Sequence, residues 1–361
     1  MLLADSKETN KIKTTCPYCG VGCGVITKKT VTGGVSVEGD KKHPANFGRL
    51  CSKGSALGET VSDEHRLLHA YIKDKQVDLD DALDKVAKGF NDVIEQHGAD
   101  SVAFYVSGQL LTEDYYVANK LMKGYIGSAN IDTNSRLCMS SAVAGHKRAF
   151  GNDSVGLCYD DLEQAEAIIV IGSNIAWCHP VLFQRIEKVR QERELKLLIV
   201  DPRRTNSCDS ADEHLAIKPG TDAILYNGLL SYLAENNYLD KDYINANTNG
   251  FDDALLTAQQ TAPDIKTVAE LCEIDEQLVL TFYKLFTETE KVISFFSMGI
   301  NQSSSGVDKV NSIINAHLAS GKIGKIGTGA FSITGQPNAM GGREVGGLAT
   351  TLAAHMDFSE E

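Results

Sequence analysis

Short apolar runs and stretches with helical spacing alternate along most of the chain. Continuous apolar runs predict buried strands, because only a strand covered on both faces is apolar at every position. Uninterrupted runs lie at 102–106 and 167–171, and runs that include one polar residue lie at 195–200, 214–217 and 292–296. Apolar positions at helical spacing predict helices over 80–94, 112–125, 143–150, 180–193, 222–236, 265–272, 275–288 and 307–321. Strands that alternate with helices are typical of α/β domains with largely parallel sheets.

The two ends of the chain depart from this alternation. Near the start, residues 24–28 and 31–37 predict a short hairpin whose turn is at Gly33 and Gly34. Residues 14–62 are therefore expected to form a small β-rich domain. Near the end, residues 324–347 are rich in glycine without a clear period and predict a binding loop or a return of the chain to an earlier domain. Residues 348–361 predict the start of another helix.

Composition narrows the classes of partner. The chain has 361 residues, 42% of them hydrophobic, which is enough for two or three domains. A net charge of −13 argues against nucleic acid or an acidic membrane surface as the main partner, and it means that a small anionic substrate needs a local cationic site. No apolar run reaches the roughly 18 residues of a membrane-spanning helix, and the first 16 residues lack the features of an export signal. We therefore expect a cytoplasmic protein whose nine cysteines are ligands or buried thiols rather than disulfides.

Four cysteines near the start have the spacing of a metal centre. Cys16, Cys19 and Cys23 form a C-x2-C-x3-C group, and Cys51 follows after the predicted hairpin. A clustered triplet with one distant thiol favours a [4Fe-4S] cluster. The alternatives are a four-cysteine zinc site, which more often pairs two short knuckles, and unconnected buried cysteines. Lys53 lies two residues beyond the fourth thiol and by itself indicates only a solvated lysine.

Small and polar residues follow four of the predicted strands. Three of these segments are 172–174 (Gly-Ser-Asn), 201–204 (Asp-Pro-Arg-Arg) and 219–222 (Pro-Gly-Thr-Asp). Each segment alone also fits an ordinary strand end, a surface charge cluster or a helix cap. Ligands of open α/β sheets lie outside the carboxyl ends of the strands, and a carboxylate beside two guanidiniums suits a purine edge, a ribose or a phosphate. Together the segments predict a nucleotide-bearing cofactor. The chain has no P-loop and no clean G-x-G-x-x-G motif, so ordinary ATP or NAD binding is not indicated.

Cys138 lies where a predicted loop runs into a helix. A thiol at such a junction is a good metal ligand or nucleophile, and the alternative is a small buried apolar side chain. The remaining cysteines have no partners at a suitable spacing and are expected to be buried thiols: Cys158, Cys178, Cys208 and Cys272. The histidines are scattered and are interpreted as structural or exposed. No hydrolase motif such as G-x-S-x-G is present.

Taken together, these motifs resemble the molybdenum bis-pterin guanine dinucleotide oxidoreductase family over about residues 14–357. The resemblance rests on the cysteine frame with Lys53, on Asn134-x3-Cys138, and on the strand-end segments 172–174, 201–205, 219–222 and 298–302. Within the family, residues 334–345 (TGQPNAMGGREV) are most similar to the cytoplasmic assimilatory nitrate reductases. The family resemblance implies a multi-domain α/β chain with a [4Fe-4S] domain at 9–66, an α/β molybdopterin domain at 67–150 plus 330–361, and a Rossmann-like domain at 151–329 that binds the guanine dinucleotide.

The resemblance also implies roles for individual residues. Cys16, Cys19, Cys23 and Cys51 would hold the [4Fe-4S] cluster, and Lys53 would lie on the electron path between the cluster and a pterin. Cys138 would be the thiolate ligand of molybdenum, with Met139 beside it, and Arg343 would draw nitrate to the metal. The residues implied to line the bis-molybdopterin guanine dinucleotide are Gln109, Asn134, Gly172, Ser173, Asn174, Asp201, Arg203, Thr205, Gly220, Asp222, Met298 and Gln302.

The implied reaction is molybdenum-dependent reduction of nitrate to nitrite by oxygen-atom transfer, with electrons entering through the cluster from ferredoxin, flavodoxin or an NADH-linked flavoprotein. Formate dehydrogenases of the same family are one alternative, but their metal-bound cysteine or selenocysteine is typically followed by histidine, whereas Met139 follows here. A second alternative is an inactive electron-transfer module that holds the cluster without molybdenum. Cys138 and the paired Arg203 and Arg204 argue against it.

The length departs from the family pattern. Family members are usually much longer and close the second pterin site with a C-terminal β-barrel domain, for which no segment is found before Glu361. We therefore expect a truncated chain whose molybdopterin domain is incomplete. Such a chain would leave part of the cofactor cleft uncovered and would bind the cofactor poorly on its own.

Overall fold

The apolar runs form neighbouring strands of one parallel sheet in a computed structural model of the protein, which describes residues 11–153 and 155–356. Residues 9, 10 and 357–361 of the expected domains lie outside this described part. Every residue of β8 and β11 is buried, which confirms that these mostly apolar runs became central strands. The strands, in sheet order, are β10 (Glu213–Leu215), β9 (Lys196–Val200), β8 (Ala167–Ile171), β11 (Val292–Phe296) and β12 (Gly329–Ser332).

The register of the parallel strands places the carboxyl ends of β8, β9 and β11 at one edge of the sheet. Ile171 pairs with Val200 on one side and with Phe296 on the other, so the loops that follow β8, β9 and β11 leave from the same edge. The sheet also contains β12, inside the stretch that was expected to be a loop. That expectation was wrong at 329–332 because Gly-Ala-Phe-Ser carries too short an apolar pattern to be recognised as a strand.

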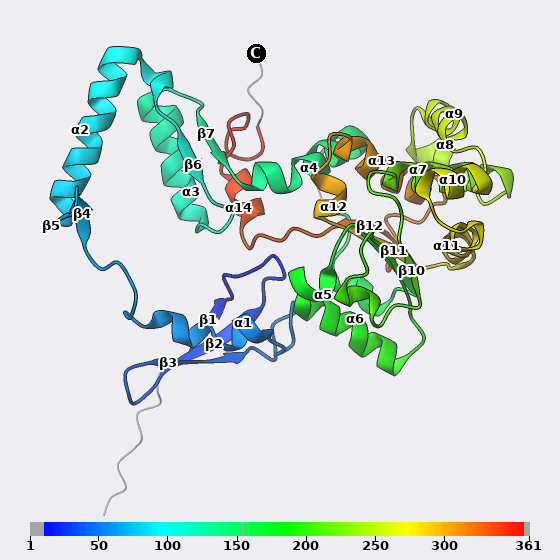
Figure 1. Ribbon diagram of the computed structural model, residues 1–361, viewed down its shortest axis with the longest axis horizontal. Coiled ribbons are helices and arrows are strands. Elements are labelled where there is room, and N and C mark those ends of the chain that lie inside the picture. The colour runs from blue at the N-terminus through cyan, green and yellow to red at the C-terminus, as the bar shows by residue number, and fades with distance from the viewer. Residues whose placement is uncertain (1–10, 154, 357–361) are drawn as a thin grey trace, which may run out of the picture.

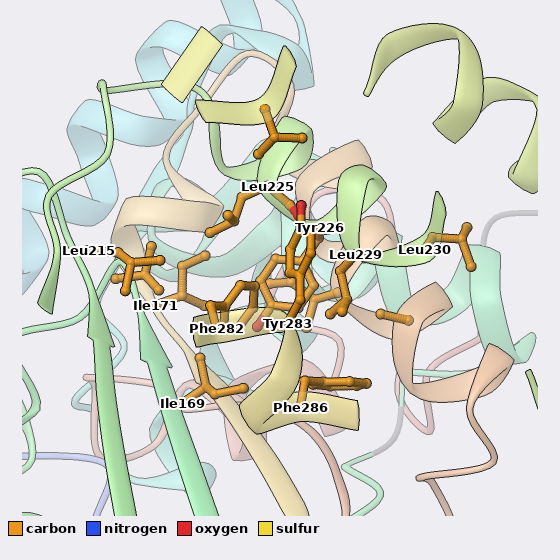
Figure 2. Close-up of a cluster of buried hydrophobic side chains, with 14 of the residues drawn as sticks. Ile169, Ile171, Leu215, Leu225, Tyr226, Leu229, Leu230, Phe282, Tyr283 and Phe286 are labelled. Carbon is orange, nitrogen blue, oxygen red and sulfur yellow. The ribbon is translucent and has the colours of Figure 1, made fainter. Parts of the chain in front are cut away.

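Helices cover both faces of the sheet (Figure 1). Alternate residues of β8 serve opposite cores: Ile169 and Ile171 face one helical layer, and Ile168 and Val170 face the other. Figure 2 shows the first core, in which Tyr226 and other buried side chains meet the strands. Each buried Ile, Leu or Phe side chain contributes about 1.5–3 kcal/mol. The helices of this domain are α5 (Ile175–Cys178), α6 (Pro180–Glu192), α7 (Asp222–Glu235), α8 (Lys241–Asn247), α9 (Phe251–Thr261), α10 (Ile265–Cys272), α11 (Glu276–Glu288), α12 (Met298–Asn301) and α13 (Gly306–Ala319).

The cysteine-bearing segment forms a three-stranded antiparallel sheet of β1 (Ile12–Thr15), β2 (Gly24–Lys29) and β3 (Val35–Gly39), followed by α1 (Ser52–Ser55). The predicted hairpin is confirmed: β2 pairs with β3, and Gly33 has a φ of 90°, which suits glycine. This small unit lies beside the large sheet (Figure 1), and Cys16, Cys23 and Val25 share a hydrophobic core with β8 and α6.

A second α/β unit stands at the other side of the molecule (Figure 1). Its parallel strands β6 and β7 form a sheet of their own, and Tyr105 of β6 is 72% exposed. The expected buried strand at 102–106 is therefore covered on one face only, by Phe90 and Ile94 of α2 together with Met122. The elements here are β4 (Ala70–Ile72), β5 (Lys75–Val77), α2 (Leu79–His97), β6 (Phe104–Val106), α3 (Thr112–Asn119), the π-helix η3 (Lys120–Ile126), β7 (Ile131–Thr133) and α4 (Ser135–Phe150).

The end of the described chain returns to this second unit. Short α14 (Ala339–Glu344) contacts α3, and Lys123 of η3 donates to the carbonyl oxygens of Gly346 and Leu348, each at 2.8 Å. The helix expected from 348 onward is wrong for the described residues. Val345 instead forms a bridge with Ala353, and His355 has a left-handed φ of 58° that interrupts a helix.

The α/β class with largely parallel sheets, preceded by a small β-rich unit, is confirmed, whereas the three domain boundaries stay predictions. Short 3-10 helices complete the architecture: η1 (Leu57–Val61), η2 (Ala99–Ser101), η4 (Tyr159–Glu163) and η5 (Asn206–Cys208). None of the helices in the described residues is long and apolar enough to cross a membrane.

Stability is expected to depend on pH through His317 of α13. Its Nε2 lies 2.8 Å from Ser294 Oγ and its Nδ1 2.9 Å from the Lys322 carbonyl oxygen, and burial lowers the pKa of His317 from 6.5 to about 4. Between pH 6.5 and 4, His317 is protonated in the unfolded chain but not in the folded one. The free energy of unfolding therefore falls as pH drops from 6.5 towards 4, by up to roughly 3 kcal/mol. His317→Gln does not titrate and should show a shallower fall between pH 6.5 and 5 in urea unfolding. Equal slopes for the two proteins would contradict this assignment.

Candidate functional site

The four cysteines of the N-terminal unit lie near enough to influence one another's ionisation. Cys16 and Cys23 are joined by a backbone hydrogen bond of 2.8 Å, and Cys51 comes directly before α1. Burial raises the pKa of Cys16, Cys19 and Cys23, the last to about 12, and the neighbouring thiols raise each pKa further. Among the described residues, no three His, Cys, Asp or Glu side chains are close enough to hold a single metal ion. The arrangement is a half-buried cage of four interacting thiols.

A buried arginine fastens this cage to the large sheet. Arg185 of α6 is 1% exposed, and its guanidinium donates to Glu163 at 2.6 Å and to the Pro44 carbonyl oxygen at 2.8 Å. The same group stacks on the ring of Phe47, 5.0 Å from the ring centroid. Because a buried cation is costly unless it is fully paired, this set of contacts fixes the cysteine unit against α6.

A backbone contact joins the cage to the return segment after β12. The Gly20 N–H donates to the Gly335 carbonyl oxygen at 3.0 Å, and Tyr159 Oη donates to the Gly20 carbonyl oxygen at 3.2 Å. A Cβ at position 20 would lie 2.1 Å from the Thr334 carbonyl oxygen, so only glycine allows this approach. The cage is thereby held beside residues 334–335.

The carboxyl-edge loops of the sheet line a cavity of about 330 Å³. Ser173, Asp201 and Asp222 contribute buried polar side chains, and Asp222 pairs with the buried Lys309 of α13 at 2.6 Å. Carboxylates there can accept hydrogen bonds from a purine edge. Eight of the twelve expected cofactor residues line this cavity: Gly172, Ser173, Asn174, Asp201, Arg203, Gly220, Asp222 and Met298.

The other four expected residues lie elsewhere. Thr205 is buried with its Oγ1 3.9 Å from Cys208 Sγ, and Gln302 donates to the Leu137 carbonyl oxygen at 3.1 Å. Asn134 precedes α4 and accepts the Gly108 N–H through its Oδ1 at 2.9 Å, next to the exposed Gln109. Asn134 and Gln109 therefore lie in two neighbouring loops of the second α/β unit, apart from this cavity.

Cys138 lies in the first turn of α4 and is 7% exposed. Its Sγ is 3.6 Å from Met298 Sδ, so it reaches the loop after β11. Beside it, Met139 Sδ accepts the hydroxyl of Thr334 at 2.9 Å. Burial raises the pKa of Cys138, and the backbone of Gly335 acts in the opposite direction. The helix thus places this thiol between the edge of the large sheet and the return segment.

Arg343 of α14 is 6% exposed and forms an ion pair with Asp153. Burial would raise the pKa of Asp153, but His146, at 3.7 Å, and the charge of Arg343 together hold it below its ordinary value. These three side chains line a cavity of about 330 Å³ that we call the inner cavity, which also includes Met139 and His179. His179 is buried, and burial lowers its pKa.

Sequence reasoning missed His146, Asp153 and His179, which were interpreted as structural or were not singled out. His146 follows Met139 by seven residues and so lies on the same face of α4, a spacing that could have been noticed. Cys178 was expected to be an inert buried thiol but is partly exposed, lines the strand-edge cavity and lies 3.2 Å from His179 Nδ1. Cys158 is exposed, so the expectation of burial was wrong there.

Lys53 is exposed on α1, with its Nζ 5.9 Å from the centroid of the Tyr18 ring. Its place on an electron path stays a prediction.

Comparison with known proteins identifies the family. Residues 67–360 match the molybdopterin oxidoreductase profile. The chain belongs to the molybdopterin oxidoreductase family. Residues 9–63 match the Fe4S4 domain of molybdopterin oxidoreductases. The cysteine spacing allowed either an iron–sulfur cluster or a zinc site, and this match decides for the iron–sulfur cluster.

Similar proteins include nitrate reductases. The chain is 53% identical over 350 residues to the nitrate reductase of Klebsiella oxytoca, covering 97% of this chain and 40% of that protein. It is 38% identical over 368 residues to the periplasmic nitrate reductase of Desulfovibrio desulfuricans, covering 97% of this chain and 48% of that protein. Acetylene hydratase of Pelobacter acetylenicus has the same fold, with a TM-score of 0.76 and 19% identity over 86% of this chain and 43% of the other. The chain thus spans about half the length of these proteins or less.

The residues present fit the groups that the family carries. The neighbouring cysteines raise one another's pKa because their thiolate forms would repel, and bound iron can neutralise such thiolates. The strand-edge cavity offers the buried carboxylates of Asp201 and Asp222, and a Cβ on Gly172 would lie 2.9 Å from the Gly299 backbone, which keeps the floor of that cavity free of side chains. A molybdopterin cofactor and a [4Fe-4S] cluster are therefore compatible with this molybdopterin oxidoreductase chain.

Replacing one cage thiol tests the cluster. Cys51→Ala should lower the iron content from about four atoms per chain to nearly none and abolish the visible absorption of the cluster, because three thiolates hold it poorly. Cys272→Ala, which removes a buried thiol on α10, is the matched control and should keep the iron. Unchanged iron in the Cys51 variant would show that the cluster has another ligand set.

The buried Asp153–Arg343 ion pair should contribute more to the free energy of unfolding than the exposed Asp308–Arg148 pair. Asp153→Asn leaves Arg343 charged and unpaired, and should lower the free energy of unfolding by about 3–5 kcal/mol. Asp308→Asn removes a carboxylate that is 70% exposed and 2.8 Å from Arg148, so it should cost less than about 1 kcal/mol. Denaturant unfolding of the two variants side by side measures both losses. Similar losses would mean that the Asp153–Arg343 pair is not an isolated buried pair.

Proposed function

We propose that this chain carries the cluster and the molybdenum-binding side of a nitrate reductase, an enzyme that reduces nitrate to nitrite by oxygen-atom transfer. The observation that carries the proposal is the convergence of Cys138, Met298 and Met139 between the strand-edge cavity and the buried Arg343. The likeness to named nitrate reductases supports the substrate. Because the chain spans only part of those proteins, their activity is assigned here as a proposal.

The chain's own residues bind and position the reactants. Asp201, Asp222 and Ser173 bind the guanine nucleotide at the strand edge, and Cys138 supplies the thiolate ligand to molybdenum. Bound there, the cofactor supplies the two-electron oxygen-atom transfer. Arg343, fixed by Asp153, holds the anionic substrate through charge-assisted hydrogen bonds. The reaction consumes two electrons and two protons per nitrate and releases nitrite and water.

Electrons enter through the cysteine cage. The Gly20–Gly335 contact holds the cage next to the return segment, and Lys53 would bridge the cluster to a pterin. The donor that we propose is a small redox protein, ferredoxin or flavodoxin, or an NADH-linked flavoprotein. We place the protein in the cytoplasm and in nitrate assimilation on its sequence, although one of its relatives is periplasmic.

Formate oxidation is the alternative within the family. Met139 favours nitrate, because its thioether packs against Cys138 and Thr334 where an imidazole would instead place a titratable base. Parallel assays of formate oxidation and nitrate reduction by the cofactor-loaded chain discriminate the two. Formate turnover without nitrate turnover would overturn the proposal.

Removing the proposed metal ligand is the sharpest test of this function. Cys138→Ala should lower nitrate reduction by at least about 100-fold, measured with a strongly reducing dye as electron donor, while the iron content stays normal. Cys272→Ala again serves as the control and should keep both activity and molybdenum. Full nitrate turnover by the Cys138 variant at normal molybdenum content would contradict the assignment of Cys138 as the metal ligand.

A further inference from the structure

A series of hydrogen bonds joins the strand-edge cavity to the inner cavity. Ser173 Oγ lies 3.4 Å from Cys178 Sγ, and Cys178 Sγ lies 3.2 Å from His179 Nδ1. His179 Nε2 lies 2.7 Å from the Thr334 carbonyl oxygen, and the Thr334 hydroxyl donates to Met139 Sδ at 2.9 Å. Ser173 and Cys178 line the strand-edge cavity, whereas the other three residues line the inner cavity. We call these five residues the relay.

The hydrogen bonds of the relay all run in one direction. The Thr334 carbonyl oxygen can only accept, so His179 Nε2 carries a proton. Burial lowers the pKa of His179, so the imidazole is neutral and its Nδ1 accepts the S–H of Cys178. The sulfur of Cys178 then accepts the hydroxyl of Ser173. Because the thioether of Met139 at the far end accepts a hydrogen bond but passes no proton on, the relay orients groups and does not conduct protons.

Thr334 is where the relay meets both proposed centres. Its carbonyl oxygen lies against Gly20 of the cage, where a Cβ would come within 2.1 Å. Its hydroxyl holds Met139, the neighbour of the proposed metal ligand Cys138. The ring of His179 is 1% exposed, so a ring nitrogen that loses its partner finds no water to replace it. The position of Thr334 therefore depends on which nitrogen of His179 carries the proton.

We propose that Cys178 and His179 are positioning residues of this oxidoreductase. The S–H of Cys178 selects the tautomer of His179 that donates to the Thr334 carbonyl oxygen, and Thr334 in turn fixes Met139 beside Cys138. This inference rests on the proposed function, because it treats Cys138 as the metal ligand. It goes beyond that function by giving a role to a thiol outside the cysteine cage and to the imidazole next to it.

Substitution of Cys178 tests the relay without molybdenum. Cys178→Ser keeps a donor beside His179 Nδ1, whereas Cys178→Ala is of similar size and removes that donor. The readout is the rate at which iodoacetamide alkylates Cys138 in the iron-loaded chain, followed by mass spectrometry. Cys178→Ala should alkylate Cys138 about five- to tenfold faster than the parent chain, and Cys178→Ser and the control Cys272→Ala should stay within about twofold of it. Equal rates in the Ala and Ser variants, whether fast or slow, would overturn the relay.

A double variant tests whether the effect of Cys178 passes through Thr334. Thr334→Val removes the hydroxyl that holds Met139 and should by itself speed alkylation of Cys138 about five- to tenfold. If Cys178 acts through Thr334, adding Cys178→Ala to Thr334→Val should change the rate by less than about twofold. A double variant that is accelerated by the product of the two single effects would mean that the sites act independently, and would also overturn the relay.

Nitrate turnover separates the relay from the proposed function. In the molybdenum-loaded chain, Cys178→Ala should lower kcat about tenfold and leave KM within about twofold, because it acts on the setting of the metal ligand rather than on capture of nitrate. Cys178→Ser should restore kcat. The expected alkylation rates without nitrate reduction by the molybdenum-loaded parent chain would keep the relay and overturn the proposed function. Nitrate reduction with equal kcat in the Ala and Ser variants would keep the function and overturn the positioning role.

Discussion

The relation between the cysteine cage and the rest of the molecule depends on one buried cation. Arg185 has almost no exposed surface and binds Glu163 of η4 and the Pro44 carbonyl oxygen of the cysteine unit at once. The cysteine unit has a thin core of its own, since β1 is exposed along its whole length. Its orientation therefore comes from contacts with the large domain. Arg185 and the Gly20–Gly335 hydrogen bond together fix that orientation.

A single helix then organises the proposed chemistry. Along α4, Cys138 contacts Met298 at the start of α12, and Met139 lines the inner cavity. Further on, His146 lies beside Asp153 in the same cavity. A helix is a rigid element, so these groups keep fixed spacings without relying on loops. The proposed metal ligand and the side chain that pairs with Asp153 are thus positioned by the same hydrogen-bonded backbone.

Electrostatics explains how an acidic chain can serve an anionic substrate. The acidic residues are spread over a large surface, whereas Arg343 is buried in a region of low dielectric where its charge is screened little. Asp153 meets that guanidinium at Nη1, and Nε has no hydrogen-bond partner among the described residues. The cost of burying this charge is thus offset in part by a protein carboxylate and in part, under our proposal, by the substrate.

The sequence alone was sufficient for features that depend on neighbours along the chain. Apolar runs at 167–171 and 292–296 became the central strands, and the cysteine spacing with Cys138 led to the right family, because periodicity and ligand spacing are local properties. Tertiary structure alone decided the rest. It brought Arg343 to Asp153 and Arg185 to Pro44, and it placed β12 beside β11. These contacts join segments that are distant in the sequence, and the local sequence of each segment does not indicate its partner. A charged residue that becomes buried cannot be told from a surface one by its sequence, because only the folded structure excludes water from it.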